Sequence, residues 1–136
     1  MNEGDLALRN EVYRRFAAGG VPTRAELGDD EGLRRLHDAH AVVLDERGEI
    51  LMANPFSAVP TPYRVEAGGK AWYANCAWDA FGIPAALHVD GHVSCTCPDC
   101  GEPIEVDVGL ARELPRGPVF HVVVPAARWW DDIVFT

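Results

Sequence analysis

Apolar residues near the N-terminus recur at the three- and four-residue spacing of an amphipathic helix. The positions that follow this spacing are Leu6, Leu8, Val12, Tyr13 and Phe16. The pair Gly19–Gly20 predicts where the helix ends. A capping box formed by Thr23 and Glu26 then predicts a second helix. A third segment keeps Leu33, Leu36 and Ala39 on one helical face.

Two short apolar runs follow between residues 41 and 54, and a turn at Glu46–Gly48 separates them. This pattern predicts a β-hairpin after three helices, which is the element order of a winged helix. Residues 1–40 carry more acidic than basic side chains, so they offer no basic recognition helix. We therefore interpret residues 1–54 as a winged-helix-like packing module rather than a DNA reader.

The second half, residues 55–136, begins with a segment that Pro55, Pro60 and Pro62 hold extended. Strand-like runs then flank Gly68–Gly69, which predicts a hairpin. The further elements that we expect are strands over residues 87–108 with a turn at 97–103, a short helix near 109–114, a buried strand at 119–125 and a last strand beginning at 131. The fold class is therefore α+β, with small antiparallel sheets flanked by helices.

The composition and charge of the chain limit the classes of partner that it can bind. The chain has 136 residues, 48% of them hydrophobic, and a formal net charge of −9. That charge argues against a nucleic-acid surface, because phosphate binding needs clustered Lys and Arg. The N-terminal residues resemble no signal peptide, and no apolar run reaches membrane-spanning length. We expect a cytoplasmic, reducing setting, in which four cysteines indicate metal binding or catalysis rather than disulfides.

One cysteine has an aspartate three residues later: Cys76 and Asp79. Asn75 is a good N-cap residue, which predicts a helix whose first turn holds Cys76 and which ends near Gly82 and Pro84. A helix N-terminus favours a thiolate, and residues three apart share one face. Such a pair can move a proton between thiol and carboxylate. On spacing alone, an inert buried thiol is the more common explanation.

The other three cysteines form a C-x-C-x-x-C pattern: Cys95, Cys97 and Cys100. The stretch CPDCG is typical of one half of a zinc ribbon, but a tetrahedral site needs four ligands. Cys76, His88, His92 or His121 are candidates for the fourth. The alternatives are structural zinc, adventitious binding of soft metals, and a plain turn whose cysteines a reducing cell tolerates.

Other side chains suggest less chemistry. His37 and His40 lie three apart on a predicted helix, where a solvated or packing role is expected. Trp72, Tyr73, Trp78, Trp129 and Trp130 are expected mostly in the core. Some of them would wall an apolar pocket for an organic group.

The stretches FSAVPTPYRV and GKAWYANCAWDAFGIPAAL resemble the organomercurial (alkylmercury) lyase family. The similarity continues through VSCTCPDCGEPI and FHVVVPAARWWDDIVF, so it covers most of the chain. The resemblance implies a winged-helix-like N-terminal part, a catalytic core, and protonolysis of a carbon–mercury bond. It also implies that Cys76 and Asp79 are catalytic. The expected partners are a small organomercurial and external thiols, no cofactor is required, and Hg(II) is the product.

The family's second catalytic cysteine follows the segment that matches WWDDIVF. Here the sequence stops at Thr136, and no cysteine follows Cys100. We therefore expect the C-terminal strand and helix of the family to be lacking, through truncation or divergence. The alternative function is a non-catalytic thiol protein that binds Hg, Zn or Cu through Cys76, Cys95, Cys97 and Cys100.

Overall fold

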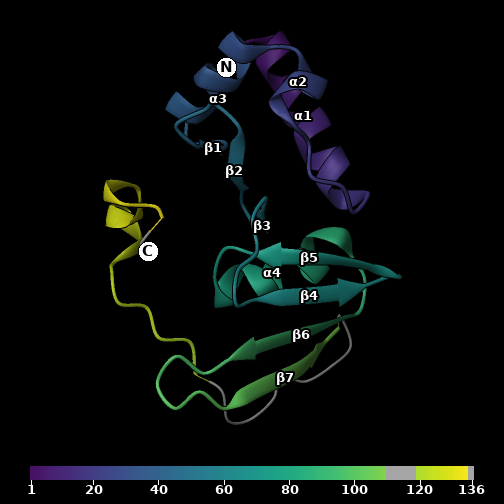
Figure 1. The fold of residues 1–136 in the computed structure, drawn as a ribbon, viewed down its shortest axis with the longest axis vertical. Coiled ribbons are helices and arrows are strands. Elements are labelled where there is room, and N and C mark those ends of the chain that lie inside the picture. Colours follow the sequence, from purple (N-terminus) through teal and green to yellow (C-terminus); the bar gives the residue numbers. More distant parts are fainter. Residues whose placement is uncertain (110–118, 135–136) are drawn as a thin grey trace.

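A computed structural model describes residues 1–109 and 119–134. The chain begins with three helices and continues into strands that carry one further α-helix (Figure 1). The elements are α1 (Glu3–Ala17), α2 (Arg24–Leu27), α3 (Asp30–Asp38), β1 (Val43–Leu44), β2 (Ile50–Ala53), β3 (Phe56–Ser57), β4 (Arg64–Ala67), β5 (Lys70–Ala74), α4 (Ala77–Leu87), β6 (Gly91–Thr96), β7 (Pro103–Val108) and the 3₁₀ helix η1 (Ala126–Asp131). No helix in these ranges has the length and apolar composition that crossing a bilayer requires.

The helices of the N-terminal part begin where the sequence predicts. Thr23 accepts from the backbone N–H of Glu26, whose carboxylate accepts from the N–H of Thr23, so the predicted capping box of α2 is confirmed. The predicted hairpin is also present as β1 and β2, which pair antiparallel. The order of three helices and a hairpin is therefore confirmed.

The described strands form one seven-stranded sheet in the order β1-β2-β3-β5-β4-β6-β7, in which every pair is antiparallel. The sequence instead predicts several small sheets, so this part of the prediction is wrong. The extended segment after Pro55 supplies β3, which pairs with both β2 and β5 and so joins the two halves of the sheet. The predicted hairpin around Gly68–Gly69 is confirmed, and both glycines have positive φ values of +56° and +74°.

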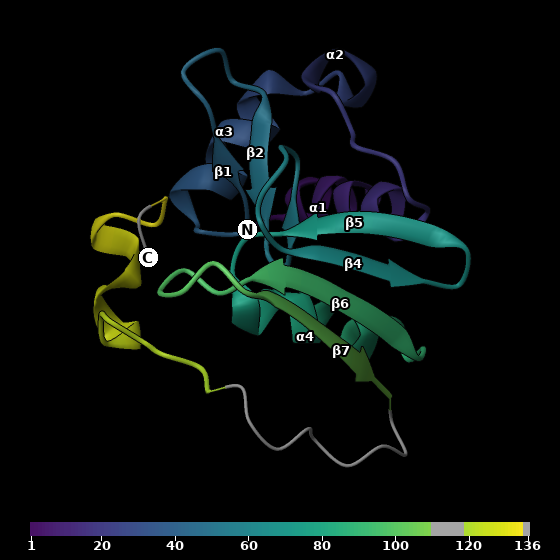
Figure 2. The same ribbon diagram turned by 60° about the horizontal axis from the view of Figure 1, so that its bottom comes forward.

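Helix α4 lies across one face of β4, β5 and β6 (Figure 2). The face beneath it is apolar because alternate strand residues point towards the helix; among them Val65, Trp72 and Val93 are buried. Gly91 permits this contact, since a Cβ at that position would stand 2.7 Å from Pro84 Cγ. The opposite face of β6 and β7 carries polar side chains such as His92 and Glu105.

One hydrophobic core runs through both halves of the chain. The ring of Phe16 in α1 stacks on that of Phe56 in β3, with centroids 5.3 Å apart. The indole N–H of Trp72 in β5 donates to the carbonyl oxygen of Phe16. The helices therefore pack directly on the strands that lead to α4.

The two strands predicted near the C-terminus are absent from the residues that the structure describes there. Residues 119–125 form no strand, and Val119 and Val123 are 88% and 79% exposed. An apolar run becomes a buried strand only when a sheet edge receives it, and these residues instead follow the outside of the molecule. Asp131 ends η1 and Asp132 to Val134 form a turn rather than a strand. The short helix predicted near 109–114 lies, except for Gly109, outside the described residues.

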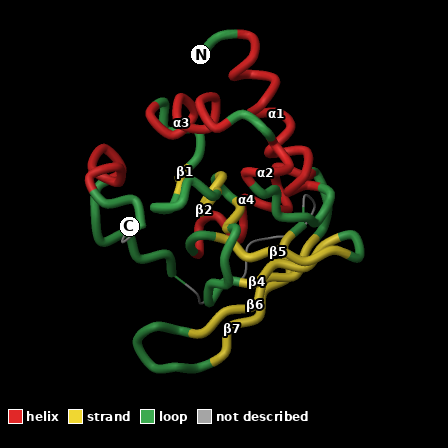
Figure 3. The backbone as a smooth tube through the Cα atoms, turned by 45° about the horizontal axis from the view of Figure 1, so that its top comes forward, coloured by secondary structure: helices red, strands yellow, loops and turns green. Residues whose placement is uncertain are grey.

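Figure 3 shows η1 beside the loop that follows α3. There the ring of Trp130 stacks on His40 at 4.0 Å, while the indole of Trp129 donates to the carbonyl oxygen of Val124. His37 accepts a hydrogen bond from the backbone N–H of Leu44 through Nδ1. Both histidines thus have the packing roles that the sequence predicts.

Candidate active site

Helix α4 begins one residue later than its sequence predicts. The N-cap is Cys76, which has extended backbone angles (φ −150°, ψ 178°), and its carbonyl oxygen accepts the N–H of Ala80 at 3.0 Å. The helix also continues past Gly82 and Pro84 to Leu87. Proline lacks only one helical hydrogen bond, and burial of Ile83 and Pro84 against the sheet outweighs that loss. The left-handed residue His88 ends the helix.

The thiol of Cys76 is half-buried, and burial raises its pKa. The backbone N–H groups of Asp79 and Trp78 act in the opposite direction, as expected at a helix start. The charge of Asp79 again favours the protonated thiol. The helix N-terminus thus favours a thiolate at Cys76, as the sequence predicts, but burial has the larger and opposite effect on the pKa.

The carboxyl group of Asp79 is also half-buried, and burial raises its pKa. The side chains of Asn75 and Cys76 favour its ionised form as hydrogen-bond donors. The thiol and the carboxylate therefore interact across the first turn of α4, as their spacing predicts. A proton can pass from the sulfur of Cys76 to the carboxylate without bulk water.

Asn75 has a role that the sequence did not indicate. Its side-chain Nδ2 lies 3.2 Å from Asp79 Oδ2, 2.8 Å from Asn54 Oδ1 and 3.2 Å from the carbonyl oxygen of Phe56. Its Oδ1 is buried and has no hydrogen-bond partner among the described residues. Asn75 thus holds the Asp79 carboxylate against the loop before β3 instead of capping α4.

Two tyrosines from distant segments approach the same pair. Burial raises the pKa of Tyr63, and the charges of Cys95 and Cys76 act on it in the same direction. Burial also raises the pKa of Tyr13, to which Asp79 contributes, while its hydroxyl donates to the carbonyl oxygen of Asn54 at 3.1 Å. Neither tyrosine carried a sequence signal, because strand register and helix packing bring them here.

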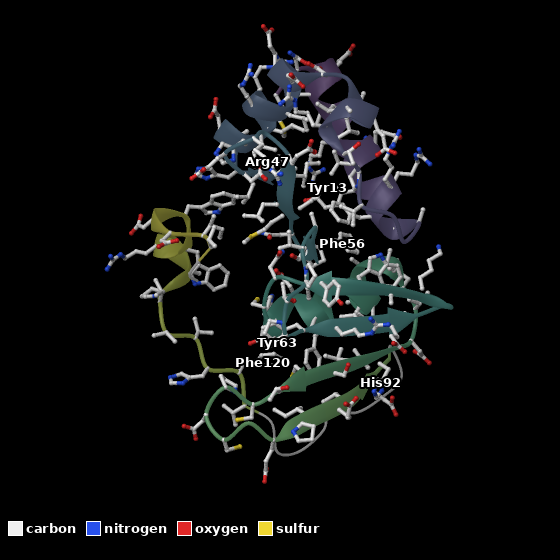
Figure 4. The ribbon with its side chains drawn as sticks, in the orientation of Figure 1. Tyr13, Arg47, Phe56, Tyr63, His92 and Phe120 are labelled. Atoms are coloured by element: carbon white, nitrogen blue, oxygen red, sulfur yellow. The ribbon has the colours of Figure 1, made fainter. Side chains whose placement is uncertain are left out.

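An aromatic cluster adjoins the pair on α4. Phe120 makes edge contacts with Trp78 and Phe81, with centroids 5.9 and 5.0 Å apart. Trp78 is 66% exposed, so its predicted place in the core is wrong, whereas Trp72 is buried as predicted. Figure 4 shows Phe120 at the same end of the sheet as Tyr63 and away from His92.

The other cysteines lie on β6 and in the turn after it. Cys95 pairs with Ile104 in the sheet, and Cys97 and Cys100 stand in the turn between β6 and β7. Among the described residues, no three side chains of His, Cys, Asp or Glu gather closely enough to hold a metal ion. The predicted set of Cys76, Cys95, Cys97 and Cys100 therefore does not come together as one such group among the described residues.

The candidate histidine ligands have other surroundings. His92 lies between Glu105 and Asp107, with nitrogen–oxygen distances of 2.6 and 2.8 Å. His88 forms the C-cap of α4, and His121 is exposed. None of these three histidines joins the cysteines in a group of three or more potential ligands among the described residues.

Two hollows of about 430 and 630 Å³ lie elsewhere on the surface. One is lined by Arg24, Asp30 and Arg34, and the other by residues of the β4–β5 hairpin and His92. Neither is lined by Cys76 or Asp79. The Arg24 guanidinium in the first hollow is already paired with Asp30 at 2.8 Å. The chemistry of the Cys76–Asp79 pair therefore marks the site better than the shape of the surface does.

Comparison with known proteins places the chain. The sequence model of the alkylmercury lyase family, MerB, matches residues 56–136. An alkylmercury lyase of Staphylococcus epidermidis is 33% identical over 88 residues, which cover 62% of this chain and 40% of that protein. The crystal structure of the mercury-bound form of MerB2 aligns with a TM-score of 0.63 and 22% identity, over 79% of this chain and 57% of that one.

The structural likeness concerns the fold, which both chains share as a mixed α/β arrangement. The chain spans less than two thirds of the length of either relative. The family match includes Cys76, Asp79 and Tyr63, and it extends over more than half of the sequence. The chain therefore belongs to the alkylmercury lyase family.

Proposed function

We propose that this protein is an organomercurial lyase-like enzyme that cleaves a carbon–mercury bond by protonation. The observation that carries the proposal is the interaction of the Cys76 thiol with the Asp79 carboxylate at the half-buried start of α4. Membership of the alkylmercury lyase family supports it. The products would be a hydrocarbon and Hg(II).

The proposed reaction begins when Cys76 gives its proton to the carboxylate of Asp79. The resulting thiolate binds the mercury of R–Hg–X and displaces X as an anion into solvent, because a soft cation prefers sulfur to oxygen ligands. Thiolate ligands increase the electron density on the carbon. Asp79 then returns the proton to that carbon, R–H leaves, and Hg(II) remains on sulfur. Each proton and electron pair is thereby accounted for without an oxidant or a resident cofactor.

The surroundings suit both steps. A carboxyl group whose pKa is raised by burial holds a proton closer to neutral pH than an exposed aspartate does. Asn75 fixes the orientation of that carboxyl group through the 3.2 Å contact with Oδ2. The aromatic cluster of Trp78, Phe81 and Phe120 offers an apolar contact for the organic group.

External thiols would complete the cycle. We propose that one supplies a second sulfur ligand to mercury and that others extract Hg(II) from Cys76. This requirement suits a reducing, cytoplasmic setting. Hydrocarbon release should therefore rise with the concentration of external thiol and reach a plateau.

The winged-helix-like interpretation of residues 1–54 fits a scaffolding role. The Tyr13 hydroxyl donates to the carbonyl oxygen of Asn54, in the loop that contacts Asn75, and the ring of Phe16 stacks on that of Phe56 in β3. We propose that these helices position the catalytic segment and bind no nucleic acid.

The test is a turnover assay with a phenylmercury salt and excess monothiol, in which benzene is measured by gas chromatography. We expect benzene release from the unchanged protein and its loss in Cys76→Ser and Asp79→Ala. Asp90→Ala is the matched control, because Asp90 is an exposed carboxylate in the turn after α4. Benzene release at the rate of thiol alone would refute the proposal, as would full activity of Asp79→Ala.

A further inference from the structure

The turn between β6 and β7 brings two thiols together outside the catalytic pair. The backbone N–H of Cys97 donates to the carbonyl oxygen of Glu102 at 2.8 Å, and the N–H of Gly101 donates to the carbonyl oxygen of Cys97 at 2.9 Å. Gly101 has a φ of +74°, which closes the turn in a conformation that favours glycine. These bonds fix the backbone that carries both Cys97 and Cys100.

The sulfur of Cys97 accepts hydrogen bonds within the turn. The backbone N–H groups of Cys100 and Asp99, followed by the Cys100 thiol, donate towards it and lower its pKa. Burial instead raises the pKa of Cys76 and of Cys95. The Cys97 and Cys100 side chains therefore lie within hydrogen-bonding reach of each other in the turn.

The number of ligands selects the cation. Cys97 is partly exposed and Cys100 is exposed, so solvent reaches both sulfurs. No third His, Cys, Asp or Glu completes a metal-binding group in the part of the chain that the structure describes. Zinc requires four ligands, whereas Hg(II) is stable with two sulfur ligands in a line.

We propose that the Cys97–Cys100 turn is a second, two-thiolate site for Hg(II), separate from Cys76 and Asp79. Its formation from a mercury bis-thiolate is a ligand exchange without redox chemistry. The Cys97 thiolate displaces one external thiolate. The Cys100 sulfur displaces the other, and its proton goes to the departing sulfur.

The position of the turn suggests what the site is for. Strand β6 ends at Thr96, opposite the start of β4, so the turn lies at the end of the sheet where Tyr63 stands (Figure 4). Cys95 acts electrostatically on Tyr63, as does Cys76, and Cys97 acts on Cys95. The turn can thus receive the Hg(II) that leaves Cys76. This role rests on the proposed lyase function, whereas binding of Hg(II) does not.

The test isolates the two thiols in the full chain. The double variant Cys76→Ser/Cys95→Ser retains only Cys97 and Cys100, and its matched control adds Cys100→Ser. Each protein receives one equivalent of Hg(II) in excess 2-mercaptoethanol, is desalted, and is weighed by native mass spectrometry. We expect the double variant to hold one Hg(II) and to resist the monothiol on the order of 10²-fold better than the control, because the second thiol binds intramolecularly.

Loss of Hg(II) from the double variant would overturn the proposal, as would equal retention by the single-thiol control. Should these substitutions at half-buried positions prevent folding, the unchanged protein provides the second measurement. After loading with Hg(II) and alkylation, peptide mapping should show Cys97 and Cys100 protected together. Alkylation of both at the rate of the metal-free protein would refute the site. Because Cys76 is absent from the double variant, retention of Hg(II) by that variant is independent of lyase activity.

Discussion

Phe56→Ala should sharply reduce the stability of the whole molecule. Phe56 is 3% exposed, and its ring contacts Phe16 at 5.3 Å and Trp72 at 6.2 Å. Truncating a buried phenylalanine costs about 3–5 kcal/mol of unfolding free energy. Each aromatic pair adds about 0.5–1.5 kcal/mol beyond burial, which places this site in the upper half of that range. The total stability of a typical domain is only about 5–15 kcal/mol.

The measurement is urea denaturation followed by tryptophan fluorescence and far-ultraviolet circular dichroism. Phe120→Ala is the matched control, because Phe120 also touches two aromatic rings but is 41% exposed. Its loss should be less than half as large. The two probes should report one transition, since Phe56 joins the helices to the sheet. A loss below about 2 kcal/mol, or separate transitions for helices and sheet, would refute the shared core.

Three further changes have defined outcomes. Burial raises the pKa of Asp79, so the folded state holds its proton more tightly and stability falls as the pH rises through that pKa. Asp79→Asn should therefore unfold at a higher urea concentration than the parent at pH 7 but not at pH 3. A variant stabilised at pH 3 but not at pH 7 would contradict this reasoning. Gly91→Ala forces a Cβ to 2.7 Å from Pro84 Cγ and should cost about 1–3 kcal/mol in the same assay, whereas an unchanged midpoint would show that α4 does not rest there. Two carboxylates on β7 raise the pKa of His92, so the stabilisation from these ion pairs is present at mildly acidic pH and lost as the pH rises. His92→Gln should lower the free energy of unfolding by about 0.5 kcal/mol at pH 5 and leave it unchanged at pH 9. An equal loss of stability at pH 9 would exclude the charge effect.

The elements that the sequence predicted correctly depend on neighbouring residues. The capping box of Thr23 and Glu26 and the glycines at 68 and 69 define local conformations through contacts only a few residues apart. The joining of the strands into one sheet depends on β3 and β5, which are distant in sequence. Local patterns cannot specify such a pairing, because alternation fixes only which face a residue occupies.

Two of the wrong element predictions have a common origin. Pro84 is a helix breaker by propensity, yet the sheet buries it inside α4. Residues 119–125 are apolar enough for a buried strand, yet they pair with no strand in the described part of the chain. In both places the surroundings in space outweigh the local preference.

The site was predictable to a similar extent. The spacing of Cys76 and Asp79 correctly predicts their interaction, because three residues of helix suffice to bring them together. The direction of the thiol pKa was not predictable, since it depends on burial by other segments. The sequence did not indicate the contacts of Asn75 and Tyr63 for the same reason. The contacts of Asn75 depend on the loop before β3, and those of Tyr63 depend on the register of β4.

The strand order of the sheet also bears on how the protein folds. Most pairings join successive strands, namely β1–β2, β2–β3, β4–β5 and β6–β7, and such local hairpins form quickly. Only β3–β5 and β4–β6 close longer loops, and these two pairings bring Asn54 to Asn75 and Cys95 to Tyr63. We therefore expect the hairpins to form before the candidate site, which pulsed hydrogen exchange can check by late protection of the β3–β5 hydrogen bonds relative to those of β6–β7. Late assembly would leave the Cys76 thiol exposed during synthesis, so a soft cation would reach it more readily in the nascent chain than in the folded protein.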